Sequence, residues 1–220
     1  MTSESTTRHR RIILASGSPT RLKVLTDAGI DVVAIESGVS EDFGPVATQD
    51  AVLALARRKA MAVAAFSEDE LVLGCDSLLD LDGETIGKPG TAEKAREIWK
   101  RLRGRCAILH TGHCLIDTSK DQGNGGINRV VSRVDSTLVR FSSPSGEEID
   151  AYIASGEPLS LAGACSIEGL GAPFVEGIDG SSTNVLGVSL PLLRTMLAEL
   201  GVSITDLWRQ DRDSPGSVER

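Results

Sequence analysis

The chain has 220 residues, a formal net charge of −8, 40% hydrophobic residues and only 3% aromatic residues. This composition is typical of a soluble globular protein, and no apolar run reaches the roughly 20 residues that a membrane span needs. The acidic balance and the few aromatic side chains argue against a nucleic-acid-binding surface. The first residues lack the apolar core of a secretory signal, so we expect a cytoplasmic protein without a membrane partner.

Three segments differ in composition from the rest of the chain. Residues 1–10 and 209–220 are polar and nearly free of apolar side chains, which predicts disordered tails. Residues 118–129 are rich in turn formers and predict a solvent loop between two strands. The remaining chain, 11–208, is expected to fold as a single domain.

In the first third of the chain, predicted strands and helices alternate. The four elements are a strand at 12–15, a helix from Pro19 to Ala28, a strand at 32–35 and a helix from Thr48 to Phe66. Ser18 is expected to cap the first helix, because its hydroxyl can accept a hydrogen bond from a free N–H and proline suits the first helical position. Thr48 is expected to cap the second in the same way.

The rest of the chain adds longer strands. The predicted elements are an apolar run at 71–75, a hairpin joining 78–81 to 85–86, a helix capped by Thr91, strands at 106–117 and 130–141, a helix at 146–154, a strand near 174–178 and a helix from Pro191 to Leu200. Asp82-Gly83 is typical of a tight hairpin turn. The pattern predicts a mixed α/β fold with a long, largely antiparallel sheet, flanking helices and two lobes around a central cleft.

Three basic residues and two hydroxyls are candidates for binding an anion. Ser16, Ser18 and Arg21 surround the start of the first helix, where free N–H groups and the helix dipole favour a phosphate. A capped helix with a surface arginine explains the same residues. Lys88 lies in a loop between glycine and proline, which suits a fixed cation. Lys59 stands beside two arginines, and such a charge run usually forms a solvated face.

Two acidic positions are candidates for chemistry. Asp76 directly follows the apolar run at 71–75, and α/β proteins place reacting groups at the carboxyl ends of strands. A carboxylate there could bind Mg²⁺ or activate water, or it could cap a turn. Glu41 lies beside Asp42 in an acidic loop, where a local surface charge is the simpler interpretation.

Two other motifs have simpler explanations. The run from Asp80 to Thr85 resembles the aspartyl-phosphate motif of haloacid-dehalogenase-type phosphatases, but Glu84 stands where that family usually has threonine. A hairpin turn accounts for its Asp-Gly pair. His110 and His113 resemble a metal-binding pair, but residues three apart in a strand face opposite sides.

Several segments match one known family in both order and spacing. They are Leu14–Leu22, Arg58–Ala60, Gly74–Ser77, Gly87–Pro89, Leu102–Arg105, Gly156–Leu159, Ala162–Gly163 and Asn184–Gly187. Over about residues 11–202 the chain thereby resembles the Maf family, the septum-formation-inhibitor-like nucleoside triphosphate pyrophosphatases.

The resemblance implies a fold like that of Maf and ITPase proteins, with the site in the cleft and, in many members, a homodimer. It implies cleavage of the α–β anhydride of a nucleoside triphosphate to monophosphate and pyrophosphate with a divalent metal, Mg²⁺ or Mn²⁺. Removal of non-standard nucleotides is a role that fits this activity. Asp76 matches the family's general base. The other matched positions are Ser16, Ser18, Arg21, Lys59 and Lys88 around the phosphates, and Glu41, with Asp76, in the metal and water region.

The positions that select the base depart from the common pattern. Members that act on thymidine and uridine triphosphates typically have arginine, threonine and glutamine where this chain has Thr20, Ser77 and Glu168. Relatives that act on 7-methyl-guanosine triphosphate carry an acidic residue at the last position, so Glu168 indicates a guanine-like or modified substrate. Thr20 and Ser77 match neither group. Two other functions stay open: a non-catalytic nucleotide-binding regulator of cell division, and a phosphatase that uses Asp80.

Overall fold

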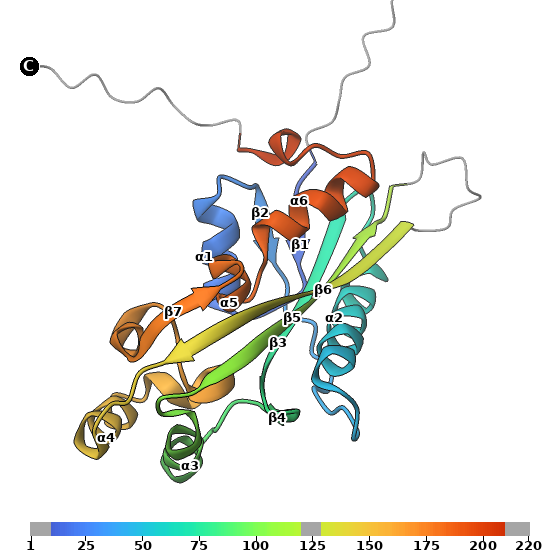
Figure 1. The fold of residues 1–220 in the computed structure, drawn as a ribbon. Helices are drawn as coiled ribbons and strands as arrows, with labels where there is room; N and C mark the ends of the chain where they lie inside the picture. Colours follow the sequence, from blue (N-terminus) through green and yellow to red (C-terminus); the bar gives the residue numbers. More distant parts are fainter. Residues whose placement is uncertain (1–9, 120–128, 210–220) are drawn as a thin grey trace, which may run out of the picture.

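The computed structural model describes residues 10–119 and 129–209 (Figure 1). Apart from Arg10 and Arg209, the tails predicted at 1–10 and 209–220 lie outside the described residues, as does most of the loop predicted at 118–129. Two residues at these margins are held by the fold. Arg10 pairs with the buried Asp117 at 2.5 Å, and the backbone N–H of Arg209 donates to the Gly29 carbonyl.

Seven strands and six α-helices make up the described chain. The strands are β1 (Ile12–Leu14), β2 (Val32–Ala34), β3 (Leu71–Leu81), β4 (Glu84–Ile86), β5 (Cys106–Asp117), β6 (Arg129–Phe141) and β7 (Val175–Asp179). The helices are α1 (Pro19–Asp27), α2 (Thr48–Ala64), α3 (Ala92–Leu102), α4 (Gly146–Ala154), α5 (Ser182–Val185) and α6 (Leu190–Glu199). Short 3-10 turns lie at Glu157–Ser160, Ala162–Ala164, Gly169–Phe174 and Ile204–Leu207. Among these helices none is both long and apolar enough to cross a lipid bilayer.

The strands form one sheet in the order β2-β1-β3-β5-β6-β7, with β4 paired to the far end of β3. β1 pairs in parallel with β2 and β3, whereas the pairs β3–β5, β5–β6 and β6–β7 are antiparallel. This topology confirms the predicted mixed α/β fold with a long, largely antiparallel sheet.

β3 differs from its prediction. It is one continuous strand of 11 residues, where the sequence predicted an apolar run that ends at Asp76 and a separate strand after it. Gly74 and Asp76 suggested a break, but β5 pairs with β3 along this stretch and places Asp76 opposite Gly112. Asp76 therefore lies in the middle of a strand, and the prediction that it follows the end of its own strand was wrong.

The opposite edge of β3 is open at this point. β1 pairs with β3 only as far as Leu73, and β4 begins to pair at Leu79. Residues 74–78 thus lie in a gap between two neighbouring strands. Because β1 and β3 are parallel, this gap is at the carboxyl end of β1, the edge where α/β proteins commonly bind ligands.

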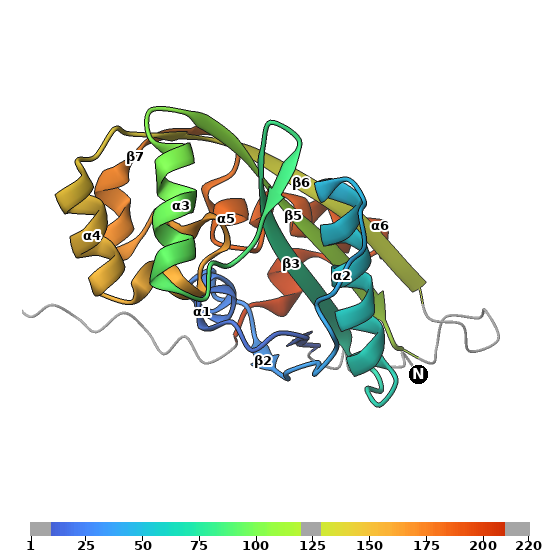
Figure 2. The same cartoon turned by 90° about the horizontal axis from the view of Figure 1, so that it is seen from below.

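One face of the sheet carries two apolar clusters, and α2 covers the other face (Figures 1 and 2). The first cluster joins α1 and α6 to the β1 end of the sheet, and the second joins α3 and α4 to the opposite end. Between them, on the same face, lie the hydroxyls of Ser77, Thr111 and Thr137 on three adjacent strands. This band of hydroxyls separates the two apolar clusters.

Helix starts follow the predicted caps with one exception. Ser18 caps α1 and Thr91 caps α3, each through its side-chain oxygen. α2, in contrast, begins at Thr48 itself and has no side-chain cap. The Thr48 hydroxyl donates to Asp80 Oδ2 at 2.9 Å and lies 2.7 Å from the Thr85 hydroxyl. The predicted cap was wrong because the β3–β4 hairpin binds that hydroxyl.

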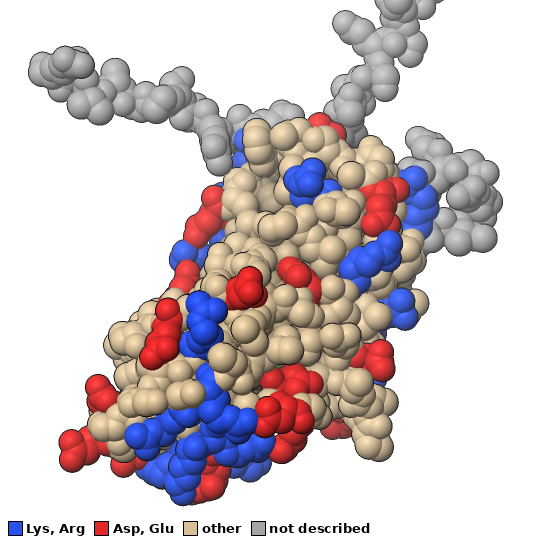
Figure 3. Space-filling model, in the orientation of Figure 1, with Lys and Arg blue, Asp and Glu red and all other residues tan. Residues whose placement is uncertain are grey.

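Charged side chains at the α3 end of the molecule are largely paired. Figure 3 shows Lys and Arg gathered there and mixed with Asp and Glu. The short ion pairs in this region are Arg96–Asp150, Lys100–Glu97, Arg101–Glu84 and Arg105–Asp82. Exposed pairs of this kind contribute little to stability, typically about 0–1 kcal/mol each, and they neutralise much of the positive charge on this face.

Candidate active site

Two glycines let α2 lie directly on the sheet. A Cβ at Gly74 would overlap the Ala56 carbonyl, and one at Gly112 would overlap the Val52 carbonyl, both on α2. Gly112 is the cross-strand partner of Asp76, so the close packing occurs beside this carboxylate. The short separation between helix and sheet brings Lys59 of α2 to Asp76.

Lys59 lies between two carboxylates. Its Nζ donates to Asp76 Oδ1 at 2.5 Å and to Glu41 Oε1 at 2.6 Å, and Lys88 Nζ is 3.8 Å from Glu41 Oε2. Lys59 is only 5% exposed and Asp76 only 7%. The interpretation of Lys59 as part of a solvated face was wrong, because the glycines beneath α2 draw it inward. We call Asp76, Glu41, Lys59 and Lys88 the carboxylate cluster.

The positive charges in this cluster lower the pKa of Glu41. The hydrogen bond from Lys59 lowers the pKa of Glu41, and the positive charges of Lys88 and Arg21 lower the pKa further, whereas partial burial opposes them. The loop that carries Glu41 is held by Arg58, whose Nη1 donates to the Ser40 carbonyl at 2.6 Å and the Asp42 carbonyl at 3.0 Å. Glu41 is thus a fixed partner of Lys59, not an isolated surface charge.

Arg21 gathers the predicted anion-binding residues. Its Nη1 donates to Ser16 Oγ at 3.2 Å, its Nη2 to Ser77 Oγ at 3.1 Å and its Nε to the Gly187 carbonyl at 3.1 Å. Ser16 Oγ also accepts from the Ser18 N–H. All three acceptors of the guanidinium are neutral oxygens. We call Arg21, Ser16, Ser18 and Ser77 the arginine cluster.

The two clusters meet at the open edge of β3. Asp76 and Ser77 are consecutive, so their side chains leave opposite faces of the sheet. Asp76 faces α2, and Ser77 faces α1 and α5. A ligand that reached both residues would have a buried carboxylate on one side and an arginine at a helix N-terminus on the other. The positive end of the helix dipole at that terminus favours an anion.

The other two predicted specificity residues make no contact with the carboxylate cluster among the described residues. Thr20 is half-buried and directly precedes Arg21 on α1. Glu168 is exposed and borders a hollow of about 310 Å³ beside α1, together with Lys23 and Asp27. Lys23 pairs with Asp27 at 2.5 Å. The hollow starts two residues beyond Arg21 on the same helix.

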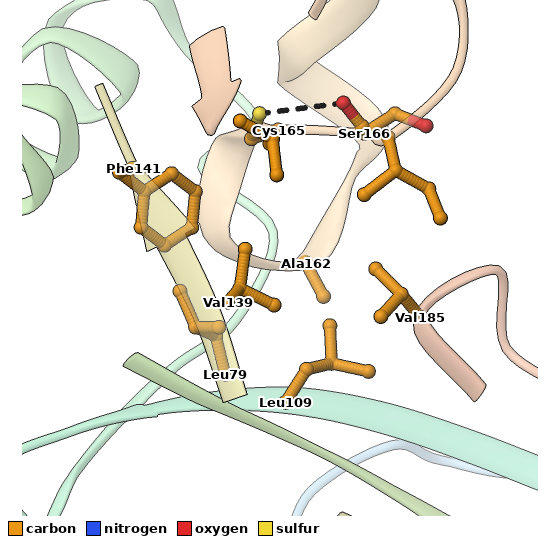
Figure 4. Close-up of a pocket in the computed structure, with 10 residues that line it drawn as sticks. Leu79, Leu109, Val139, Phe141, Ala162, Cys165, Ser166 and Val185 are labelled. Atoms are coloured by element: carbon orange, nitrogen blue, oxygen red, sulfur yellow. Dashed lines mark hydrogen bonds between the residues drawn. The ribbon is translucent and has the colours of Figure 1, made fainter. Parts of the chain in front are cut away.

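A second hollow is apolar and small. Figure 4 shows side chains such as Leu79, Leu109 and Val139 pointing into it, next to Cys165. Its volume is about 10 Å³, which is room for at most about one water molecule. Burial raises the pKa of the Cys165 thiol to about 12, so the thiol stays protonated near neutral pH. This hollow is part of the packed core and not a binding site for a nucleotide.

The residues with simpler explanations have structural partners. Asp80 accepts from Thr48 and, at 2.7 Å, from the Gly83 N–H. Asp82 and Gly83 have φ values of 56° and 85°, as the predicted tight turn requires. The Asp80 carboxylate therefore stabilises the hairpin through these two hydrogen bonds.

The two histidines separate as the strand period predicts. His110 Nδ1 lies 2.7 Å from the Ser136 hydroxyl, whereas His113 Nε2 accepts from the Ser189 N–H at the start of α6. Burial lowers the pKa of His113 to about 4. The imidazoles serve two different faces of β5 and form no metal pair.

A divalent cation would find only part of its ligands in the protein. The described residues contain no group of three or more His, Cys, Asp or Glu side chains arranged around one point. Asp76 and Glu41 are two carboxylates that already share one positive charge, that of Lys59. Because Mg²⁺ is commonly held by one or two carboxylates together with substrate phosphates, this donor set fits such an ion in the presence of a phosphate ligand.

Three residues of the site were missed from the sequence. Thr111 accepts the Ser77 hydroxyl, Asn184 provides the carbonyl to which Thr111 donates, and Gly187 provides the acceptor for Arg21. Thr111 is a polar residue within a mainly apolar strand, and this was the sequence signal that could have indicated a buried hydrogen bond. Asn184 and Gly187 were noticed only as part of a segment typical of a family.

Comparison with known proteins identifies the family. The family model described as "Maf-like protein" matches residues 11–200. A nucleoside triphosphate pyrophosphatase of Streptomyces avermitilis is 52% identical over 202 residues, covering 90% of this chain and 95% of the relative. One of Streptomyces coelicolor is 50% identical over 207 residues, covering 93% and 97%. A solved HAM1 protein structure from Coxiella burnetii has a TM-score of 0.42 and 18% identity, covering 86% of this chain and 99% of that one, a similarity too low to support an inference. The chain belongs to the Maf-like protein family.

Proposed function

We propose that this protein is a nucleoside triphosphate pyrophosphatase, which hydrolyses the α–β anhydride to release a nucleoside monophosphate and pyrophosphate. The activity is that named for its relatives. The observation that carries the proposal is Lys59, buried between Asp76 and Glu41 at the same open strand edge as Arg21. A carboxylate that can take a proton thus stands beside a cation that can hold a phosphate.

The arginine cluster would bind the phosphate chain. Arg21 is fixed by neutral oxygens, so its positive charge is available to an anionic ligand. The positive end of the α1 dipole and the exposed Lys88 would add further favourable interactions. Together these groups offset the charge that a triphosphate brings and that its transition state spreads over the phosphoryl oxygens.

Asp76 would act as the general base. A water oxygen attacks the α-phosphorus, and the water gives its proton to the Asp76 carboxylate while the bond from the α-phosphorus to the bridging oxygen breaks. Pyrophosphate leaves with the electron pair of that bond. Lys59 holds Asp76 in place and neutralises its charge, so that the buried carboxylate does not repel the substrate. No covalent enzyme intermediate is needed.

Asp76 and Glu41 would hold a divalent metal, Mg²⁺ or Mn²⁺, together with the substrate phosphates. Such an ion supplies charge neutralisation on the phosphoryl oxygens and orients the triphosphate. Lys59 must then release part of its contact with the two carboxylates, and the phosphate chain offers it new acceptors. Glu41 is suited to this exchange because it is exposed, whereas Asp76 is buried.

We further propose a guanine-like or modified base as the preferred substrate, consistent with removal of non-standard nucleotides. Glu168 is an exposed carboxylate at a hollow lined by Lys23 and Asp27 of α1, the helix that carries Arg21. A carboxylate only accepts hydrogen bonds, and guanine offers N1–H and N2–H₂ as adjacent donors. Thymine and uracil present one N–H between two carbonyl oxygens, which a carboxylate repels.

Substitution of Glu168 tests this choice of base. Glu168→Gln replaces an acceptor pair with one acceptor and one donor, so we expect the ratio of kcat/KM for guanosine over thymidine triphosphate to fall by about tenfold, the value of roughly one hydrogen bond to a charged group. Lys23→Gln, at the same hollow, is the control for a general change of charge. An unchanged ratio would remove Glu168 from base recognition.

Product analysis tests the activity itself. The purified protein is incubated with standard and modified nucleoside triphosphates, with Mg²⁺ or Mn²⁺ and with chelator. Release of pyrophosphate with monophosphate supports the proposal. Release of orthophosphate indicates a phosphatase, and Asp80→Asn then shows whether that residue is its nucleophile. Binding without any product indicates a nucleotide-binding regulator.

A further inference from the structure

The hydroxyl of Ser77 belongs to a directed chain of hydrogen bonds. Arg21 Nη2 lies 3.1 Å from Ser77 Oγ, Ser77 Oγ lies 3.0 Å from Thr111 Oγ1, and Thr111 Oγ1 lies 3.0 Å from the Asn184 carbonyl. A carbonyl only accepts, so the single Thr111 proton points to Asn184. Thr111 must then accept the proton of Ser77. Ser77 is left as an acceptor, which is what the guanidinium needs.

This chain of hydrogen bonds runs between the two apolar clusters. It starts on α1, passes through β3 and β5 and ends at α5, and Thr111 is fully buried along it. Gly187, three residues after Asn184, accepts from Arg21 Nε. A Cβ at Gly187 would lie 2.8 Å from Arg21 Nε, so the segment 184–187 closely surrounds the guanidinium. Two of the three Arg21 contacts thereby depend on the same short segment and its attachment to β5.

We propose that Thr111 is a positioning residue that fixes the Arg21 guanidinium through Ser77 and so sets the affinity of the site for the phosphate chain. The last step rests on the proposed function, whereas the positioning of Arg21 does not. Without the Thr111 hydroxyl, Ser77 has no acceptor for its proton and can rotate. Arg21 then loses a defined partner, although no atom that touches substrate has been changed.

The first experiment measures Arg21 in the ligand-free protein. Thr111→Val keeps the shape of the side chain and removes the hydroxyl, and Thr111→Ser keeps the hydroxyl. We expect hydrogen exchange of the Arg21 Nη2 hydrogens, which donate to Ser77, to be about tenfold faster in Thr111→Val when followed by NMR, as for loss of roughly one buried hydrogen bond. Thr111→Ser should exchange like the wild type. Equal exchange in all three proteins would overturn the proposal.

The second experiment measures affinity for inorganic triphosphate by calorimetry. We expect Kd to rise about five- to tenfold in Thr111→Val and to recover in Thr111→Ser. Adding Thr111→Val to Ser77→Ala should change Kd no further, because the chain is already broken. Independent, additive effects would contradict action through Ser77. If Thr111→Val does not fold, Ser77→Ala breaks the same chain and must accelerate Arg21 exchange.

Thr137 provides a matched control. It is also fully buried, lies on the neighbouring strand β6, accepts from the Asn184 side chain and donates to the Ser181 carbonyl. Thr137→Val therefore weakens the attachment of α5 without breaking the chain to Arg21. It should lower the melting temperature but leave Arg21 exchange and Kd as in the wild type. Equal effects of both substitutions would show that Thr111 only anchors α5.

Failure to release pyrophosphate from any triphosphate would reject the proposed function while leaving the exchange result valid.

Discussion

The two faces of β3 at Asp76 and Ser77 provide different electrostatic environments for a cation. On the α2 face, Lys59 is held by two carboxylates at 2.5 and 2.6 Å. On the α1 face, Arg21 is held by two hydroxyls and a carbonyl. Both cations are fixed, but only the first is neutralised by its neighbours. Adjacent residues of one strand thus separate a charge-compensated cluster from an uncompensated one.

This difference indicates the order in which a phosphate ligand would engage the site. A buried ion pair is costly to break because the remaining charge loses its partner. Arg21 gives up only hydrogen bonds to neutral groups, so it can bind an anion first. Lys59 would follow once the ligand and a metal have replaced its carboxylate contacts. In the proposed function, the α1 face would therefore bind the phosphate chain and the α2 face would take the proton.

Among the predicted substitutions, Asp76→Asn on the α2 face should have the largest effect on pyrophosphate release. The amide is nearly isosteric but accepts no proton, so we expect pyrophosphate release to fall by about 10²–10⁴-fold. Circular dichroism and thermal melting should show an intact fold. Asp80→Asn, four residues along the same strand, is the control and should retain turnover. Near-normal turnover in Asp76→Asn would exclude Asp76 as the base.

The α1 face should show its own dependence on pH through His113. Burial lowers the pKa of His113 from its ordinary value of 6.5 to about 4, so the unfolded chain binds the proton first as the pH falls. Stability is then lost from pH 6.5 down to about pH 4, by about 3 kcal/mol in all. Urea unfolding of wild type and His113→Gln across this range measures it. Parallel stability curves for the two proteins would contradict the expectation.

Arg21→Ala should weaken triphosphate binding by about 1.5–3 kcal/mol, the value of a charge-assisted hydrogen bond, and should affect monophosphate binding less. Lys88→Ala is the matched comparison. Lys88 is exposed and only 3.8 Å from Glu41, so its loss should cost less, about 0–1 kcal/mol. Calorimetry with a non-hydrolysable triphosphate and with the monophosphate separates the two. Equal losses for both ligands would place Arg21 away from the β- and γ-phosphates.

Local signals predicted most of the fold, and long-range contacts account for the errors. Ser18 and Thr91 cap helices because their hydroxyls bond N–H groups three residues away. Thr48 does not, because its partner Asp80 is 32 residues distant. The continuity of β3 through Asp76 likewise depends on pairing with β5, which residue types around Asp76 do not reveal.

The site was predictable as a set of residues but not as an arrangement. The start of a helix pointed to Arg21 and an apolar run pointed to Asp76, whereas Lys59 was selected only by the family resemblance. That Lys59 is buried between two carboxylates follows from the packing of α2, and no charge pattern along the helix indicates it. The hydroxyl chain through Thr111 depends on the register of β3 with β5, which sequence spacing leaves undetermined.

Gly74 and Gly112 have a consequence for protein engineering. Replacing glycine by alanine in an unstrained position often raises stability by about 0.4–1 kcal/mol, because the unfolded chain becomes less flexible. At these two positions the added methyl would push α2 off the sheet. Lys59 would move with the helix and leave Asp76 behind. The usual gain from a glycine-to-alanine replacement is therefore reversed at these positions, which would lose both helix packing and the contact between the ammonium and the carboxylate, so these glycines should be kept fixed in any library.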